Sequence, residues 1–270
     1  MDQVRLQPGL PGGRWACLRG LCGHDEAAVD GTSDLAAAAL LERLLVEAPG
    51  TTVSPATVWE LTVCDRDRLL AAVYRRHFGD RIEGDLTCRG CGERFEATFS
   101  LAELLASLEA DAGRSETGNG HRVTGPDEDG VYRLADAGRF RLPTLGDQRR
   151  AAGLDPAAAR RMLLERCVVE GDPSAAADDL DAAMAAVGPV VDLDLDAACS
   201  ECDEEQSVRF DIRSYLLAAL AREKRWLIRE VHYLATAYGW SLDEILGLPR
   251  DDRRAFVRLI EAERGAEAPR

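Results

Sequence analysis

Two CxxC pairs lie in stretches of sequence that repeat each other, and this repeat limits the possible folds more than any other feature. Cys88 and Cys91 recur as Cys199 and Cys202, at an offset of 111 residues. The same offset pairs three apolar positions that follow the cysteines: Phe99 with Phe210, Leu101 with Ile212 and Leu105 with Leu216. The pattern predicts one unit that occurs twice, with the order helix, strand, cysteine turn (a zinc knuckle), strand and helix.

A duplicated unit that supplies two thiols per copy provides what a shared four-thiolate metal site needs. We therefore expect Cys88, Cys91, Cys199 and Cys202 to bind one structural zinc ion per chain. The same pairs could also bind nothing. A thioredoxin-like redox site is a weaker interpretation, because its CxxC begins a helix after a strand, whereas both pairs here lie in predicted strand–strand turns.

The other four cysteines have no counterpart in the repeat. We expect Cys17, Cys22, Cys64 and Cys167 to be small buried side chains or idle thiols. Since the start of the chain has no apolar targeting segment and no later apolar run approaches membrane-spanning length, we expect a cytoplasmic protein without a membrane segment. In that compartment, paired cysteines favour metal binding over disulfides.

The 270 residues carry a net charge of −15, which argues against a protein that mainly binds the phosphate backbone of nucleic acids. We expect an α+β fold, predominantly helical, with two zinc-ribbon-like repeat units and a C-terminal helical bundle. Ser33 and Asp211 each precede an apolar-striped stretch and are expected helix N-caps. The predicted segments are an N-terminal arm and helix (1–60), the first repeat unit (61–110), an inserted hairpin and helices (111–172), the second repeat unit (173–222) and a C-terminal helical region (223–270).

Signatures of catalysis are missing from the sequence. It contains no G-x-S-x-G, no P-loop and no G-x-G-x-x-G after a strand. No histidine shares a short motif with another ligand type, and His77 ends a predicted helix, where the helix dipole favours a cation. Four thiolates would also leave zinc no open position for water, so a zinc-dependent enzyme is the last of our hypotheses.

The C-terminal helices allow a second interpretation. A long helix, a turn at Gly239, a short helix and an arginine-bearing last helix superficially resemble a helix-turn-helix, with Arg250, Arg253, Arg254 and Arg258 on the last segment. A zinc-knuckle nucleic-acid-binding or regulatory adaptor is therefore the alternative hypothesis. Against it, Asp251 and Asp252 interrupt the arginines, and apolar spacing fits an amphipathic bundle better.

Two stretches resemble a known group of proteins. DRDRLLAAVYRRHFGDRI, from Asp65 to Ile82, and EVHYLATAYGWSLDEILGLP, from Glu230 to Pro249 and followed by Arg253 and Arg254, resemble baseplate-hub proteins of contractile phages and their relatives in extracellular contractile injection systems. The likeness covers about half of the chain. It implies a non-enzymatic structural or assembly (chaperone-like) protein whose partners are other baseplate, hub or tail subunits, with both stretches acting as folding and docking elements.

Overall fold

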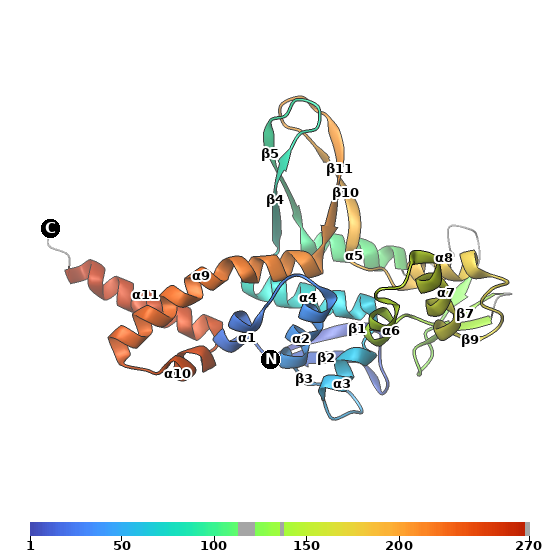
Figure 1. The fold of residues 1–270 in the computed structure, drawn as a ribbon, viewed down its shortest axis with the longest axis horizontal. Helices are drawn as coiled ribbons and strands as arrows, with labels where there is room; N and C mark the ends of the chain where they lie inside the picture. Colours follow the sequence, from blue (N-terminus) through green and yellow to red (C-terminus); the bar gives the residue numbers. More distant parts are fainter. Residues whose placement is uncertain (113–121, 136–137, 268–270) are drawn as a thin grey trace.

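Helices and strands alternate along the chain in the computed structural model, which describes residues 1–112, 122–135 and 138–267. The molecule is elongated, and two β-hairpins project together from one side of it (Figure 1). The mixed helix–strand fold and the helical C-terminal region confirm the coarse prediction. The predicted segments 111–172 and 223–270 lie partly outside the described residues. Within the described ranges, every helix is too short or too polar to cross a bilayer.

The predicted N-terminal arm is wrong, because the first residues form an antiparallel sheet that belongs to the core. Its strands are β1 (Asp2–Leu10), β2 (Gly13–Leu18) and β3 (Leu45–Glu47), in the order β1-β2-β3. Leu6 and Leu10 alternate with exposed or half-buried residues on β1, and both are buried. Proline and glycine residues in this stretch hid the two-residue period, yet Pro11 and Gly12 form the turn of the hairpin.

The centre of the molecule is one hydrophobic core that joins segments far apart in the sequence. Leu6 of β1, Leu69 of α4 and Leu216 of α9 are fully buried in it. Ser33 caps α2 by accepting a hydrogen bond from the Ala36 N–H, and Asp211 caps α9, as the sequence predicted. The helices around this core are α1 (Gly23–Ala28), α2 (Asp34–Leu44), α3 (Pro55–Glu60), α4 (Val63–Phe78) and α9 (Ile212–Tyr238).

Buried carboxylates at the start of α4 tie this helix to its neighbours. Asp65, fully buried, accepts hydrogen bonds from the backbone N–H groups of Gln7 (2.5 Å) and Gly9 (3.0 Å) in β1. Asp67, also fully buried, accepts one from the Val191 N–H (2.9 Å), just before the second hairpin. Unpaired buried carboxylates and amides are costly, so these contacts fix where both segments meet α4.

A smaller subdomain forms the other end of the molecule. It has a four-stranded antiparallel sheet in the order β6-β7-β8-β9 and its own core around Phe140 and Leu180. The hairpin and helices predicted within 111–172 are present, as the β7–β8 pair and helices that include one capped by Asp155. Its elements are β6 (Val123–Thr124), β7 (Val131–Leu134), β8 (Gly138–Arg141), α7 (Pro156–Cys167), β9 (Val168–Glu170) and α8 (Ala177–Val187). Two further helices, α5 (Leu101–Ala112) and α6 (Leu145–Ala151), lie between it and the central core, in which Leu101 and Leu145 are buried.

The C-terminal arginines of the helix-turn-helix alternative are largely inside the protein. Helices α10 (Leu242–Gly247) and α11 (Arg250–Glu267) fold back along α9. Arg250 and Arg253 are 1% and 0% exposed, and both form ion pairs with buried Glu26 of α1. Arg253 also reaches Glu230 of α9 (2.6 Å). These two guanidinium groups are therefore not available to phosphates.

His77 does not act as a cation at the end of α4, contrary to the sequence interpretation. Its Nε2 accepts a hydrogen bond from the Leu21 N–H (3.3 Å), so the ring is neutral and Nδ1 carries the proton. Burial disfavours the charged ring and Arg250 lies close by, and together they lower the pKa of His77 to about 4. Desolvation and a neighbouring positive charge outweigh the helix dipole here.

This neutral histidine should make the protein less stable in mild acid. The pKa of His77 is about 4 in the folded state against 6.5 in the unfolded chain, so between these values only the unfolded chain binds the proton. Stability is then lost as the pH falls from about 6.5 toward 4, by about 1–2 kcal/mol at pH 5. In urea unfolding at pH 7.5 and 5, His77→Gln should lose less stability than the wild type. Exposed His232→Gln is the control, and equal losses in all three proteins would contradict this origin.

Candidate metal centre

The two projecting hairpins have matching lengths and registers. In the first, β4 (Arg81–Thr87) pairs with β5 (Arg94–Ser100), and in the second, β10 (Asp192–Ala198) pairs with β11 (Glu205–Asp211). Every strand bound of the first hairpin recurs in the second at the offset of 111 residues seen for the cysteines. At their base, Phe99 and Phe210 meet edge to face with ring centroids 5.0 Å apart. The hairpins thus rise from a shared apolar base and carry their cysteine turns at the tip (Figure 1).

Both cysteine turns have the same backbone hydrogen bonds. The Cys88 N–H donates to the Glu93 carbonyl (2.8 Å) and the Gly92 N–H to the Cys88 carbonyl (3.1 Å). The second turn repeats these bonds with Cys199, Glu204 and Asp203 at 2.9 and 3.0 Å. Gly92 has φ 79° and Asp203 has φ 58°, so the aspartate adopts the left-handed conformation that the first turn gives to glycine. The second turn therefore keeps the shape of the first despite the replacement.

The structure brings all four predicted cysteines together at the tip. The sulfur atoms lie within 4.8 Å of one another, with Cys88 Sγ 3.6 Å from Cys202 Sγ and Cys91 Sγ 3.8 Å from Cys199 Sγ. Four sulfurs at about 2.3 Å from one ion at the centre of a regular tetrahedron would be about 3.8 Å apart. The cluster is therefore compatible with a single metal ion bound between the two hairpins.

Backbone N–H groups point at the inner sulfur of each turn. Cys88 Sγ accepts from the N–H groups of Gly90 (3.3 Å) and Cys91 (3.5 Å), and Cys199 Sγ accepts from the Glu201 N–H (3.4 Å). The bond from Cys91 contributes most to lowering the pKa of the Cys88 thiol, to about 6. Such N–H bonds favour the thiolate, which is the form that binds a metal.

Gln206, a residue that the sequence analysis did not single out, links the two hairpins beside the cysteines. Its side-chain oxygen accepts from the Arg89 N–H (3.0 Å) and its amide donates to the Thr87 carbonyl (3.3 Å). At the matching position of the first hairpin stands Phe95, which packs with Cys88 and Cys199. A glutamine in the place of an apolar ring is the only sign of this contact in the sequence.

Removing this link should weaken metal binding without removing a ligand. We expect Gln206→Ala to lower the metal affinity by about 10- to 100-fold, the usual effect of losing a group that orients the ligands. The exposed neighbour Ser207 on the same strand gives the control, Ser207→Ala. Competition with a chromogenic zinc chelator measures both affinities, and equal values for the two variants would show that Gln206 does not support the site.

The remaining cysteines lie away from the tip, as predicted. Burial raises the pKa of Cys64 to about 12 and that of Cys167 to about 11, so both are inert thiols. Cys17 and Cys22 are half-buried near the N-terminal sheet and α1. The candidate site therefore contains the four repeat cysteines, and with four sulfur ligands a bound ion has no open position for a substrate.

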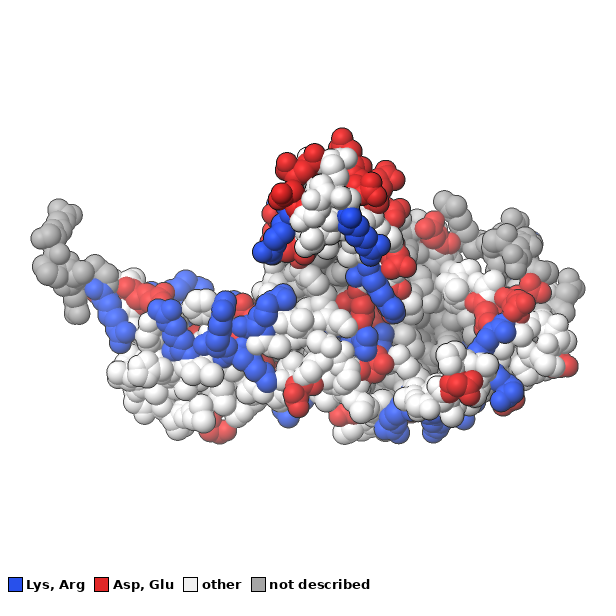
Figure 2. Space-filling view, turned by 45° about the horizontal axis from the view of Figure 1, so that its top comes forward, with Lys and Arg blue, Asp and Glu red and all other residues white. Residues whose placement is uncertain are grey.

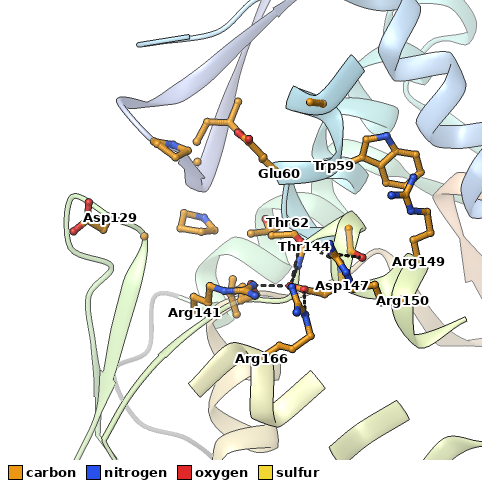
Figure 3. Close-up of a pocket in the computed structure, with 18 residues that line it drawn as sticks. Trp59, Glu60, Thr62, Asp129, Arg141, Thr144, Asp147, Arg149, Arg150 and Arg166 are labelled. Atoms are coloured by element: carbon orange, nitrogen blue, oxygen red, sulfur yellow. Dashed lines mark hydrogen bonds and ion pairs between the residues drawn. The ribbon is translucent and has the colours of Figure 1, made fainter. Parts of the chain in front are cut away.

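A second feature, a basic cavity of about 520 Å³, lies between β1, α3, α6 and α7. Figure 3 shows Arg141 and Arg166 converging on Asp147, which is 1% exposed and accepts from both at 2.6 Å. Asp147 also accepts from the Thr144 N–H in the capping box of α6. Nearby, the Arg149 guanidinium stacks on Trp59, 4.2 Å from the ring centroid. Arg141 and Arg166 join α6 to its neighbours, and we assign the cavity no ligand.

Comparisons with protein-family models, curated proteins and solved structures found no match for this chain.

Proposed function

We propose that this chain is a non-enzymatic structural or assembly (chaperone-like) protein of the baseplate of a contractile injection system. A structural zinc ion, held by Cys88, Cys91, Cys199 and Cys202, would fix its two projecting hairpins. The hairpins and the helices that flank them would be two copies of one zinc-ribbon-like unit. The expected partners are other baseplate, hub or tail subunits, and the expected location is the cytoplasm, where such particles assemble.

Ligand chemistry and spacing support zinc. Four thiolates in a tetrahedron, presented by knuckle turns with N–H groups directed at sulfur, form the usual structural zinc site. The repeated strand bounds and the repeated turn hydrogen bonds support duplication. A shared ion between the copies would hold together two hairpins whose own two-stranded sheets are too small to be stable alone.

One observation carries the baseplate proposal: charged residues in both stretches that resemble baseplate-hub proteins are buried where distant segments meet. In the first stretch Asp65 and Asp67 join α4 to β1 and to the start of the second hairpin. In the second stretch, Glu230 accepts a hydrogen bond from Arg253 and so joins α9 to α11. Proteins that share a fold need the same buried charged residues where distant segments meet. The resemblance to baseplate-hub proteins therefore includes residues that determine the fold.

The chemistry of the cysteine site and the burial of the C-terminal arginines favour a structural or assembly protein over a zinc-dependent enzyme and over a nucleic-acid-binding or regulatory adaptor. An ion with four sulfur ligands supplies no bound water for hydrolysis, which disfavours a zinc enzyme. Burial of Arg250 and Arg253 and the acidic hairpin tip disfavour a nucleic-acid-binding or regulatory adaptor.

Co-expression with the products of neighbouring genes tests the proposal. If tube, sheath or baseplate genes lie beside this one, a tagged chain should recover their products at both low and high salt. Cys88→Ser, with hairpins no longer joined, should recover less, whereas Cys17→Ser should recover as much as the wild type. Failure to bind any tail subunit, together with DNA retention that is lost at high salt, would instead establish the adaptor.

A further inference from the structure

An arginine-lined groove runs between α9 and α11 at the C-terminal end of the molecule. Its volume is about 370 Å³, and its walls contain Trp226, Tyr233 and Val257, the arginines Arg229, Arg254 and Arg258, and the glutamates Glu223, Glu230 and Glu261. Arg254 forms ion pairs with Glu223 and Glu230, so the arginines that matter for an outside carboxylate are its neighbours. Trp226 is 42% exposed, a large area for the side chain that is most often an anchor at interfaces. Tryptophan, tyrosine and arginine together have the composition of a protein-binding surface.

Arginines in and beside this groove stack on its aromatic rings. Arg225 and Arg229 lie over the Trp226 ring, 5.2 and 5.8 Å from its centroid, and Arg229 and Arg264 lie over Tyr233 at 5.2 and 5.1 Å. Among the described residues no carboxylate pairs with Arg225, Arg229, Arg258 or Arg264. A guanidinium group stacked on an aromatic ring can still offer its N–H edges to a carboxylate. Arg229 already donates from Nε and Nη2 to the Tyr233 hydroxyl at 3.0 and 2.7 Å, so it offers its remaining N–H groups, whereas Arg225 and Arg264 offer whole edges. Figure 2 shows basic side chains, with fewer acidic ones among them, along the C-terminal arm.

The chain itself has the complementary surface on its hairpins. Residues 81–100 and 192–211 contain twelve acidic residues and four arginines, so they account for more than half of the net charge of −15. Acidic side chains cover the projecting tip in Figure 2. Those exposed at the two knuckle turns are Glu93, Glu201, Asp203, Glu204 and Glu205.

We propose that the acidic knuckle tip of one copy binds in the arginine groove of a second copy. The tip and the groove lie on separate parts of the molecule (Figure 1), so the contact is head to tail and can add further copies in series. The net charge of each copy opposes association at long range, but salt at physiological strength screens charges beyond about 8 Å. The carboxylate–guanidinium contacts at the interface are much closer than that.

Sedimentation velocity of the purified chain tests this proposal without any other subunit, so its failure is independent of the baseplate role. The wild type should form dimers and larger species as its concentration rises to about 0.1 mM, in the range of weak specific contacts. Raising the salt to about 1 M should weaken the association by tenfold or more, because the contact is electrostatic. Arg225→Glu with Arg229→Glu should be monomeric, as should Glu204→Arg with Glu205→Arg.

Mixing these two double variants gives the sharpest result. The groove variant keeps its tip and the tip variant keeps its groove, so an equimolar mixture should form a 1:1 dimer and stop there. A misfolded variant could not produce that dimer. Arg149→Glu with Arg150→Glu, two exposed arginines at the opposite end, is the charge-matched control and should associate like the wild type. A monomeric wild type, or a mixture of the double variants that stays monomeric, would overturn the proposal.

Discussion

Cys88→Ser is expected to abolish stoichiometric metal binding and to lower the melting temperature by roughly 10 °C. Cys88 is 2% exposed and its sulfur lies 3.6 Å from that of Cys202 in the other hairpin, so its loss removes one of the four sulfurs that would join the hairpins at the tip. Structural zinc contributes about 10 kcal/mol or more of apparent binding free energy in small zinc folds. Because the hairpins also share an apolar base, we expect about 3–5 kcal/mol of this to be lost from global stability.

Zinc content measured by mass spectrometry and melting followed by circular dichroism check this prediction together. Cys17→Ser is the matched control, because Cys17 is half-buried, lies in β2 and is remote from the tip. The control should keep its metal and nearly its full melting temperature. A Cys88→Ser protein that melts with the wild type and still binds one equivalent of zinc would show that the four cysteines do not act as one site.

Arg253→Met should destabilise the fold almost as strongly, at the far end of the molecule. Arg253 is fully buried between Glu26 and Glu230, and methionine would leave both carboxylates without this partner. Removing one member of a buried ion pair costs about 3–5 kcal/mol, since the remaining charge stays desolvated. For a chain of this size that corresponds to a melting temperature lower by roughly 6–20 °C.

Arg258→Met, five residues further along α11 and exposed, provides the control and should change the unfolding free energy by less than about 0.5 kcal/mol. Urea unfolding measures both variants. A helix-turn-helix that uses this segment to bind phosphates would give the reverse pattern, with a stable Arg253→Met protein that has lost DNA binding.

The helix N-caps and the cysteine cluster could be predicted from the sequence, because each depends on residue types at a fixed local spacing or on the repeat. Ser33 and Asp211 begin helices because their side chains accept hydrogen bonds from N–H groups that the helix leaves free. The offset of 111 residues placed Cys88 opposite Cys199 in equivalent turns, and the structure brings the four sulfurs together. At the equivalent position of the two turns, Asp203 adopts the left-handed conformation of Gly92.

Tertiary contacts decided what the sequence could not. The N-terminal sheet was missed because Pro8 and Gly9 interrupt the alternation on β1, although Asp65 of α4 satisfies the backbone N–H groups of Gln7 and Gly9 there. Arg250 and Arg253 have the sequence pattern of exposed residues, and only the approach of α1 with Glu26 explains their burial. Glu26 is more than two hundred residues away from these arginines, so the sequence around them gives no sign of the ion pairs.

X-ray absorption at the zinc edge tests the central claim most directly, since it reports the ligands of the bound ion in the intact protein. We expect one zinc per chain, surrounded by four sulfur atoms at about 2.3 Å with no nitrogen or oxygen ligand. A spectrum with fewer than four sulfurs, or protein purified with zinc that binds none, would contradict a metal ion that joins the two hairpins.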